Sequence, residues 1–484
     1  MKPQLDRRHF LSSLLFSAAL VGCKKDPGLS PLKSTTIPKT TGSLSQPNVD
    51  QYLAEYSTTE IGTETMPTDP TWNQTINGYN NQVSYNAGDT VDVFLSGPAN
   101  ANTGIRLFDT QGNVVFETST AINPQLIKSQ KPWVEGFNYK KTLSYKIPQD
   151  FRSGIYTWDK TIPFVLKSSN KSVDITVIYP SNTINAYNYN GGKSLYAPDG
   201  NNRSFVVSFL RSTSILYKKF YKWLDEQAYS INYVADSDLE DYNEIAESRI
   251  VIIAGHSEYW TRQARQNIDT FIQSGRNVIV LSGNTMWWQV RYAPQQNLMI
   301  CYKGNPSDPL SGTEYNTINW YQKSLGYPVY PSIGVDYTQG GFGQTLSNRW
   351  DGYKIVNEKS PILAGTNLKT GDMLNIKSTE YDCIPVVKMI PQGSAEIPVI
   401  DYQKLKCYKA ELIGYDFAQN LVQGAYKQQG LGTFVVYQRT SKTGTVVNTA
   451  TMDWCWNIIY DEFQVMTKNM IELSLSGKSL FSSK

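Results

Sequence analysis

Residues 249–284 constrain the fold of this chain more than any other segment. They contain RIVIIAG, TRQARQNIDTFIQSG and NVIVLSGN, in that order. The first and last runs are rich in β-branched residues, which is typical of buried strands, and the middle run has the apolar spacing of a helix. Thr261 is a candidate N-cap and Gly275 a candidate C-cap of that helix. A strand, a helix and a second strand in this order predict a right-handed crossover between parallel strands.

The flanking segments extend this pattern in both directions. Two upstream runs, VDITVIYP and INYVAD, also resemble strands and are joined through the helix-like TSILYKKFYKWLDEQAY. We therefore predict a doubly wound α/β domain with a largely parallel sheet over residues 171–475, followed by a tail at 476–484. Residues 75–170 consist of short alternating segments between turn residues, which predicts an all-β sandwich domain in front of it.

The first 23 residues predict export from a bacterial cell. A positively charged N-terminal segment is followed by an apolar run and by a small residue before Cys23, as in a signal peptide. The ending LVGC resembles a lipobox, which implies lipidation of Cys23 and attachment to a membrane through the lipid. DRRHFL resembles a twin-arginine signal, with an ordinary signal start as the alternative. Residues 24–74 are polar and predict a flexible tether, so we expect a protein anchored in the cell envelope and facing the periplasm or the exterior.

Charge and cysteine content exclude several classes of partner. The formal net charge of +3 becomes nearly zero once the signal is removed, so no nucleic-acid partner is expected. The remaining cysteines, Cys301, Cys383, Cys407 and Cys455, show no zinc-binding spacing. Export would allow disulfides among them, and the sequence leaves their pairing open.

Polar side chains follow the predicted parallel strands at the points where these strands end. His256 and Glu258 follow one strand, Asn284 follows the next, and Asp236 and Asp238 follow an upstream one. Ligands bind at the carboxyl ends of strands in such sheets, so we expect the site at this edge. His9 lies in the signal, which leaves His256 as the single histidine of the mature chain and excludes a zinc site built from three histidines.

Seven short motifs connect the chain with a known family. They are SGIYTWDKTIPFVLK, INAYNYNGGKSLY, SFLRS, WLDEQAYSINYVADSDL, IIAGHSEYW, VLSGNTMWW and TATMDWCW. Together they resemble the large (beta) subunit of bacterial N,N-dimethylformamidase over residues 140–470. The α/β unit is also similar to class I glutamine amidotransferases, but no cysteine stands at the strand-to-helix turn where those enzymes carry their nucleophile.

The resemblance implies a mononuclear ferric ion, Fe(III), held by two tyrosinates and one glutamate. Matched to the family motifs, the glutamate is Glu258 and the tyrosines are Tyr187 and Tyr156, with Tyr196 and Tyr189 as alternatives. Anionic oxygen donors suit such a hard, highly charged ion.

The resemblance also implies three catalytic residues beside the metal. His256 would orient water or protonate the departing amine, and Asn284 would donate a hydrogen bond to the developing oxyanion. A further acidic residue matches Asp416, with Glu411 as the alternative.

The family implies hydrolysis of carbon–nitrogen amide bonds in a small-molecule amide. If Trp260, Trp287 and Trp288 line the pocket, apolar or N-alkylated amides would be favoured. The alternative is a surface-anchored lipoprotein that binds carbohydrate or peptide and whose metal site has decayed. The sequence leaves open whether the chain works alone, as a homo-oligomer or with a small subunit.

Overall fold

The computed structural model describes residues 75–98, 104–127, 129–196, 203–293, 297–343, 352–392, 395–420 and 429–483. The predicted signal, Cys23 and the predicted tether lie outside the described residues. None of the described helices has both the length and the apolar composition that crossing a bilayer requires.

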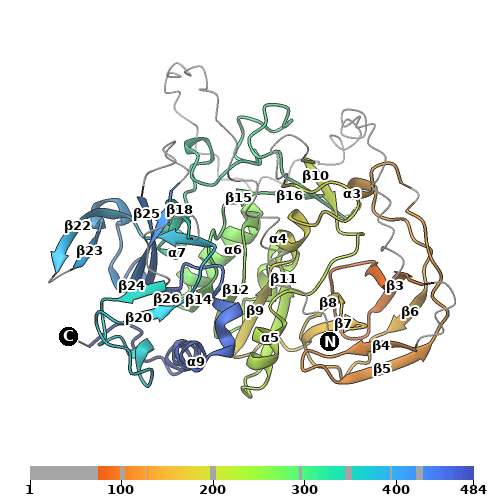
Figure 1. Cartoon of the computed structure of the whole chain (residues 1–484), viewed down its shortest axis with the longest axis horizontal. Helices are drawn as coiled ribbons and strands as arrows, with labels where there is room; N and C mark the ends of the chain where they lie inside the picture. Colours follow the sequence, from red (N-terminus) through yellow and green to blue (C-terminus); the bar gives the residue numbers. More distant parts are fainter. Residues whose placement is uncertain are drawn as a thin grey trace, which may run out of the picture.

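The N-terminal region consists of two small sheets that share one hydrophobic core (Figure 1). Along β3, Val91, Val93 and Leu95 are buried alternately, and they meet Ile105 and Leu107 of β4 in that core. The first sheet has the order β1-β3-β6 and the second β2-β8-β7-β4-β5. The strands are β1 (Asn77–Asn80), β2 (Ser84–Tyr85), β3 (Thr90–Ser96), β4 (Gly104–Phe108), β5 (Val114–Ser119), β6 (Leu143–Lys146), β7 (Gly154–Trp158) and β8 (Ile162–Leu166).

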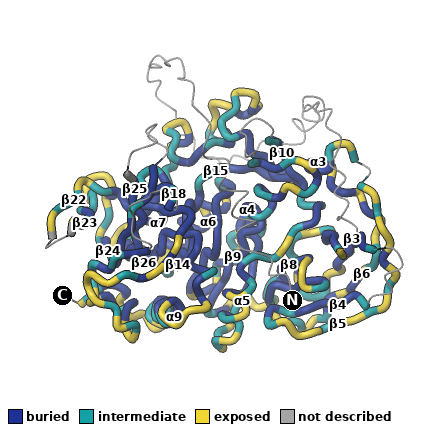
Figure 2. The backbone as a smooth tube through the Cα atoms, in the orientation of Figure 1, coloured by how far each residue is buried: buried dark blue, intermediate teal, exposed yellow. Residues whose placement is uncertain are grey.

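Parallel strands form the first half of the main sheet, in the order β11-β9-β12-β14-β26. Both faces of these strands are covered, so nearly every residue in them is buried (Figure 2). Val251 and Ile253 of β12 point to the core under α6, whereas Ile252 points to the core with α5 and α9. The elements are β9 (Ile175–Tyr179), α5 (Lys218–Asp225), β11 (Ile231–Ala235), β12 (Ile250–Ala254), α6 (Arg262–Gln273), β14 (Asn277–Leu281), β26 (Thr445–Asn448) and α9 (Asp461–Leu475).

The second half of the main sheet is antiparallel, so the prediction of a doubly wound, largely parallel fold is wrong. The order continues from β26 through β25, β24 and β18 to β21, with β19 beside β24 and β20 beside β19, and every one of these pairs is antiparallel. The strands are β18 (Asp336–Phe342), β19 (Gly352–Ile355), β20 (Met373–Asn375), β21 (Glu380–Cys383), β24 (Lys409–Gln419) and β25 (Gln429–Gln438).

The physical reason lies in the connections between these strands. A parallel pair needs a crossover of a dozen or more residues, usually a helix. Among the described residues between β18 and β26, the α-helix present is α8 (Tyr402–Leu405), which is four residues long. Neighbouring strands in this part of the chain therefore turn back on each other, and the sheet is mixed.

Short elements complete the structure around the main sheet. The hairpin of β22 and β23 projects from the rest of the molecule, with Val387 among its exposed residues (Figures 1 and 2). Two small sheets, β10-β17-β16 and β13-β15, lie above the carboxyl ends of the parallel strands (Figure 1). The bounds are α3 (Pro132–Glu135), α4 (Ser181–Ala186), β10 (Val206–Ser208), β13 (Tyr259–Trp260), β15 (Trp288–Gln289), β16 (Arg291–Ala293), β17 (Leu298–Ile300), α7 (Tyr330–Ile333), β22 (Val386–Gln392) and β23 (Ala395–Ile400).

Candidate active site at the edge of the parallel strands

Gly255 turns the chain at the end of β12 so that the next residues face the sheet edge. Its φ is +74°, and a Cβ at this position would lie 2.2 Å from the ring of Tyr217. Only glycine therefore allows Tyr217 to lie against the turn. The Tyr217 hydroxyl accepts a hydrogen bond of 2.9 Å from the backbone N–H of His256. This contact fixes the start of the segment that carries His256 and Glu258.

His256 lies between two buried carboxylates. Its Nδ1 is 3.1 Å from the carbonyl oxygen of Gly283, so a proton on Nδ1 donates to that carbonyl. Nε2 then faces Glu258 at 3.4 Å and Glu380 at 3.6 Å, measured to the Oε2 atom of each. All three side chains are buried. The imidazole can therefore exchange a proton with either carboxylate without bulk water.

Glu380 comes from a distant part of the chain and was missed by the sequence analysis. Residues 380–382 pair with residues 450–452 beyond the end of β26, through Met452 N–H to the Glu380 carbonyl at 3.3 Å. A Cβ on Gly283 would lie 2.5 Å from the Met452 nitrogen and 2.7 Å from the Glu380 carbonyl oxygen. Glycine at 283 thus permits the close approach that brings Glu380 to the site. The sequence signal was present in EYDC, since acidic residues in a buried strand are costly without a role.

Asn284 also holds the Glu380 carboxylate, at the same oxygen that His256 faces. Its Nδ2 donates to Glu380 Oε2 at 3.1 Å. Asn284 has a φ of 52°, which is uncommon for a residue other than glycine and places it in a tight turn after β14. The predicted residues His256, Glu258 and Asn284 therefore meet at one edge, together with Glu380.

Tyr187 joins the cluster from the end of α4. Its hydroxyl donates to Glu258 Oε2 at 2.7 Å, and the backbone N–H of Glu258 donates to Thr183 Oγ1 at 2.8 Å. The ring of Tyr187 lies 5.7 Å from the His256 ring and 5.1 Å from the Tyr196 ring, between centroids. Helix α4 thus positions both the side chain and the backbone of the Glu258 region.

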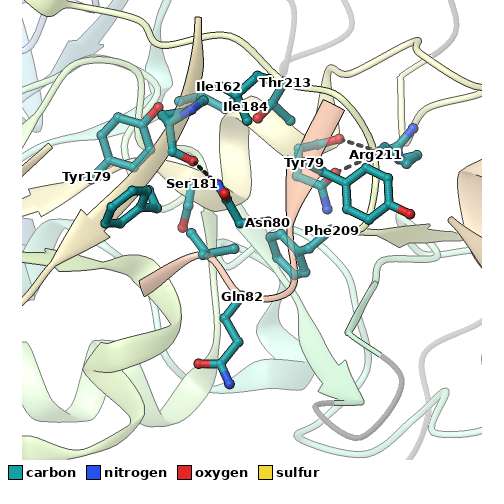
Figure 3. Close-up of a pocket in the computed structure, with 14 residues that line it drawn as sticks. Tyr79, Asn80, Gln82, Ile162, Tyr179, Ser181, Ile184, Phe209, Arg211 and Thr213 are labelled. Atoms are coloured by element: carbon teal, nitrogen blue, oxygen red, sulfur yellow. Dashed lines mark hydrogen bonds between the residues drawn. The ribbon is translucent and has the colours of Figure 1, made fainter. Parts of the chain in front are cut away.

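Arg211 fixes the loop on which Tyr187 lies. Its guanidinium donates to the carbonyls of Asn185, at 3.1 Å, and of Asn188, at 2.8 Å, on either side of Tyr187. Arg211 also lines a cavity of about 40 Å³ where α4 meets β1 and β8 (Figure 3). A space of this size holds a few water molecules at most. None of the cluster residues lines it, so this cavity is separate from the candidate active site.

The buried charges shift one another's protonation. Burial alone would lower the pKa of His256, but the hydrogen bond and charge of Glu258 and the charge of Glu380 raise it to about 9. Burial tends to raise the pKa of Glu258, and the contact with His256 outweighs this and lowers it. Burial raises the pKa of Glu380 to about 7, against the opposing charge of His256. Glu380 is thus the group of the cluster that can gain or lose a proton near neutral pH.

Several buried polar atoms near the cluster have no hydrogen-bond partner among the described residues. They include Oδ1 of Asn284 and the hydroxyls of Tyr259, on β13, and Tyr337, on β18. The charges of Glu380 and Glu258 both act on Tyr337, after burial the largest influences on its pKa, which is raised well above the usual value. Buried polar groups are rarely left unpaired, so these atoms are candidate contacts for a bound molecule or ion.

The predicted iron ligands meet only in part. Tyr187 and Glu258 present two oxygens 2.7 Å apart, a separation at which both can bind one small cation as neighbouring ligands. Tyr156 lies instead in the core of the N-terminal region, where its hydroxyl donates to the Arg152 carbonyl at 2.8 Å. No three His, Cys, Asp or Glu side chains of the described ranges are arranged to hold a metal. A ferric ion here would therefore need a second phenol near Tyr187, and Tyr196 has the adjacent ring.

The other predicted residues lie outside the cluster. Asp416, on β24, accepts a hydrogen bond of 2.8 Å from the Tyr381 hydroxyl. Glu411 accepts a hydrogen bond of 2.9 Å from the Ser482 hydroxyl. Tyr189 is exposed, and its hydroxyl donates to the Tyr196 carbonyl.

Asp236 and Asp238 stabilise the polypeptide around the parallel strands. Asp236 accepts the Asn182 N–H at 2.7 Å, and Asp238 forms an ion pair of 3.2 Å with Lys167. Cys301, Cys383, Cys407 and Cys455 are all free thiols.

The three tryptophans take different positions. Trp260 is buried, and its indole donates to the Ser257 carbonyl at 3.0 Å, so it supports the turn from within the core. Trp287 and Trp288 are half-buried; the Trp287 ring stacks on Tyr321 at 5.1 Å and meets the Tyr337 ring edge-on at 5.2 Å. Trp287 thus belongs to an aromatic wall that continues to the cluster through Tyr337.

The family model of N,N-dimethylformamidase beta subunit-like proteins, C-terminal part, matches residues 90–464. The chain belongs to this family. The match includes all the cluster residues, and the family description agrees with the resemblance noted in the sequence.

Other comparisons add little to the family assignment. No curated protein matches the chain. Among solved structures, a β-galactosidase from Bacillus circulans sp. alkalophilus aligns at 9% identity over 64% of this chain and 32% of its own, with a TM-score of 0.30. A cold-adapted β-galactosidase from Rahnella sp. R3 aligns at 10% identity over 61% and 31%, also with a TM-score of 0.30. The chain thus spans about a third of either enzyme, and no conclusion about function follows from likenesses this weak.

Proposed function

We propose that this dimethylformamidase-like chain is an exported hydrolase of carbon–nitrogen amide bonds, with its catalytic site at His256, Glu258, Glu380, Asn284 and Tyr187. The observation that carries the proposal is the buried group of coupled ionisable side chains beside unpaired polar atoms. Groups with shifted pKa values in a confined space are typical of catalytic sites.

The chain's own residues supply acid–base chemistry in this proposal. Glu380, with a pKa of about 7, takes a proton from water as the water oxygen attacks the amide carbonyl carbon. His256 then donates a proton to the departing amine as the carbon–nitrogen bond breaks, since its Nε2 faces into the site. The products are a carboxylic acid and a free amine.

Asn284 and Tyr187 orient the reacting groups. One N–H of the Asn284 side chain donates to Glu380, and its second N–H is available to the developing oxyanion. Tyr187 holds Glu258 in place through its hydroxyl.

The family resemblance supports a ferric ion held by Tyr187 and Glu258. When bound, the ion would supply Lewis-acid polarisation of the amide carbonyl. Tyrosinate ligation predicts a visible colour, so absorption spectra and metal content of the purified chain test this part directly. Glu258→Ala should lose iron and colour together, whereas His256→Ala should retain most of the iron.

Lipid anchoring rests on the LVGC sequence and is tested separately. The wild-type protein should partition into detergent, and Cys23→Ser should move it to the aqueous phase. A wild type that already stays in the aqueous phase contradicts the anchor and leaves the catalytic proposal intact.

Amine release from a panel of small and N-substituted amides tests the activity. Wild type should release amine from at least one member of the panel, and Glu258→Ala should not exceed the uncatalysed rate. Equal background rates for both proteins across the panel would reject the hydrolase. The placement of Tyr156 away from the cluster favours, as the second candidate, a lipoprotein that binds carbohydrate or peptide with a decayed metal site. That candidate predicts a colourless, iron-free and inactive wild type.

A further inference from the structure

Lys303 lies beside the cluster in a cage of aromatic rings. Its Nζ is 4.7 Å from the ring centre of Trp288, 5.1 Å from that of Tyr259 and 5.6 Å from that of Tyr196. Tyr259 directly follows Glu258 in the chain, and the Tyr196 ring contacts that of Tyr187. The cage thus places a cation beside the residues that the proposed reaction uses.

The backbone at Lys303 is held in an uncommon conformation. Its φ is 53°, in the left-handed region, and Gly304 follows with a φ of +78°. The neighbouring backbone is fixed, because Tyr302 N–H donates to Thr317 Oγ1 at 2.8 Å and Gly304 N–H donates to the Thr317 carbonyl at 2.9 Å. These contacts hold the backbone from which the Lys303 side chain extends over the aromatic rings.

The Lys303 ammonium lies against aromatic rings but has no hydrogen-bond or ion-pair partner in the described part of the chain. In the described part of the chain it makes no hydrogen bond, and no carboxylate oxygen lies within the 4.0 Å of an ion pair. Burial lowers its pKa, while the charges of Glu258 and Glu380 act in the opposite direction and Arg203 acts with burial. Lys303 is therefore a half-buried cation on which the charge of Arg203 acts, and the N–H donors of its ammonium make no hydrogen bond within the described residues.

We propose that Lys303 binds a carboxylate on the substrate, so that the amides hydrolysed here are N-acylated amino acids. This inference rests on the proposed amide hydrolase and specifies its substrate class. It replaces the expectation of apolar or N-alkylated amides, which required tryptophans to line the substrate pocket. The Trp288 ring instead contacts the Lys303 ammonium, and Trp260 lies in the core.

The reaction balances with water as the single co-reactant. Water oxygen forms a bond to the acyl carbon, the bond from that carbon to the amino-acid nitrogen breaks, and a proton passes to the nitrogen. An N-acylated amino acid and water thus give a carboxylic acid and a free amino acid, whose own carboxylate stays on Lys303 until release.

Binding is measured first, because it does not depend on turnover. Calorimetry on the full-length protein in mild detergent compares N-acetylglycine with N-isobutylacetamide, in which a neutral isopropyl group replaces the carboxylate. Wild type should bind N-acetylglycine at least about tenfold more tightly. Lys303→Met should remove this preference, and Lys303→Arg, which keeps the charge, should retain it.

The matched control is Lys193→Met. Lys193 also lies over an aromatic ring, but its Nζ is 5.1 Å from the ring centre of Trp133 and not over the rings of Tyr196, Tyr259 and Trp288. This variant should keep the preference for N-acetylglycine. Equal affinity of wild type for the two probes would overturn the proposal, and so would a loss of preference in Lys193→Met as large as in Lys303→Met.

Kinetics separate substrate recognition from a merely electrostatic role. If Lys303 binds the substrate carboxylate, Lys303→Met raises KM for N-acetylglycine at least about tenfold more than KM for N-isobutylacetamide, because only the first substrate loses a direct contact. If Lys303 only balances the charge of Glu258, both substrates lose the same factor, and that result overturns the inference. Carboxylate-selective binding without any amine release would instead reject the hydrolase and keep the Lys303 site.

Discussion

Tyr156 in the N-terminal region and Tyr187 beside the parallel strands are both buried tyrosines, yet their hydroxyls meet different partners. Tyr156 stacks between Phe151 and Phe164, with ring centroids 5.6 Å away on each side, and donates to a backbone carbonyl. Tyr187 donates to the carboxylate of Glu258. The N-terminal region uses its tyrosines as packing, whereas the edge of the main sheet gathers groups that can exchange protons.

Substitution of the newly found acidic residue should have the largest effect. Glu380→Gln keeps the shape but removes the group with a pKa of about 7, so kcat/KM for amide hydrolysis should fall by about 10²–10⁴. Asp416→Asn, at the buried carboxylate that the sequence resemblance suggested as catalytic with Glu411 as the alternative, is the control and should change kcat/KM only a few-fold. The reverse order of the two effects would restore Asp416 as the catalytic acid or base.

The close approach at Gly283 gives the next largest effect. Gly283→Ala places a Cβ against the backbone of Glu380 and Met452, so it should cost about 2 kcal/mol of unfolding free energy and at least about tenfold in kcat/KM. Gly97→Ala is the counterpart in the N-terminal region, where the nearest atom is a flexible side-chain carbon of Ile122 at 3.1 Å. Full activity in Gly97→Ala with loss in Gly283→Ala supports the comparison, and unchanged activity in Gly283→Ala contradicts it.

The Asp236→Asn substitution tests how much stability the protein loses when a buried carboxylate at the edge of the parallel strands becomes charged. Burial raises its pKa from 3.8 to about 8, so the folded state holds a proton that the unfolded chain releases above about pH 4. The folded state therefore loses stability as pH rises from about 4 to about 8. Asp236→Asn keeps the acceptor for the Asn182 N–H and removes this loss, so its stability gain over wild type should grow by up to about 1 kcal/mol per pH unit in that window. Denaturant titrations at pH 5, 6 and 7 measure it, and a gain independent of pH would show that Asp236 is ionised in the folded state.

Tyr156→Phe should have the smallest effect. It removes one hydrogen bond to the Arg152 carbonyl and leaves the stacked ring, so unfolding should cost about 1 kcal/mol less. Activity and iron content should stay at wild-type values. Loss of iron in this variant, with unchanged thermal stability, would return Tyr156 to the metal site.

Local sequence signals predicted the parts of the fold that lie in contiguous residues. The spacing of apolar residues identified the helix that α6 forms, and Thr261 caps it by accepting the Ala264 N–H at 3.1 Å. The direction of the later strands could not be predicted this way. It depends on whether a connection is long enough for a crossover, and β24 and β25 turn back on each other instead.

The site was predictable where its residues follow neighbouring strands. His256, Glu258 and Asn284 follow β12 and β14, whose parallel pairing brings their ends together. Glu380 lies 96 residues from Asn284 and arrives through pairing beyond β26, which no local pattern encodes. The family motif identified Tyr156 as a candidate metal ligand. It did not predict that the Tyr156 side chain packs in the core of the N-terminal region, because the sequence of a strand does not determine which core its side chains enter.

The central claim is that the edge cluster, and not the N-terminal region, hydrolyses amides. The most direct measurement is kcat/KM for amine release from one amide, compared among wild type, Glu258→Gln and Tyr156→Phe, with all three shown to be folded. We expect Glu258→Gln to lose at least about a hundredfold, because it breaks the contacts of Glu258 with His256 and Tyr187, and Tyr156→Phe to match wild type. Equal activity of wild type and Glu258→Gln, or a loss in Tyr156→Phe that equals that of Glu258→Gln, would contradict the claim.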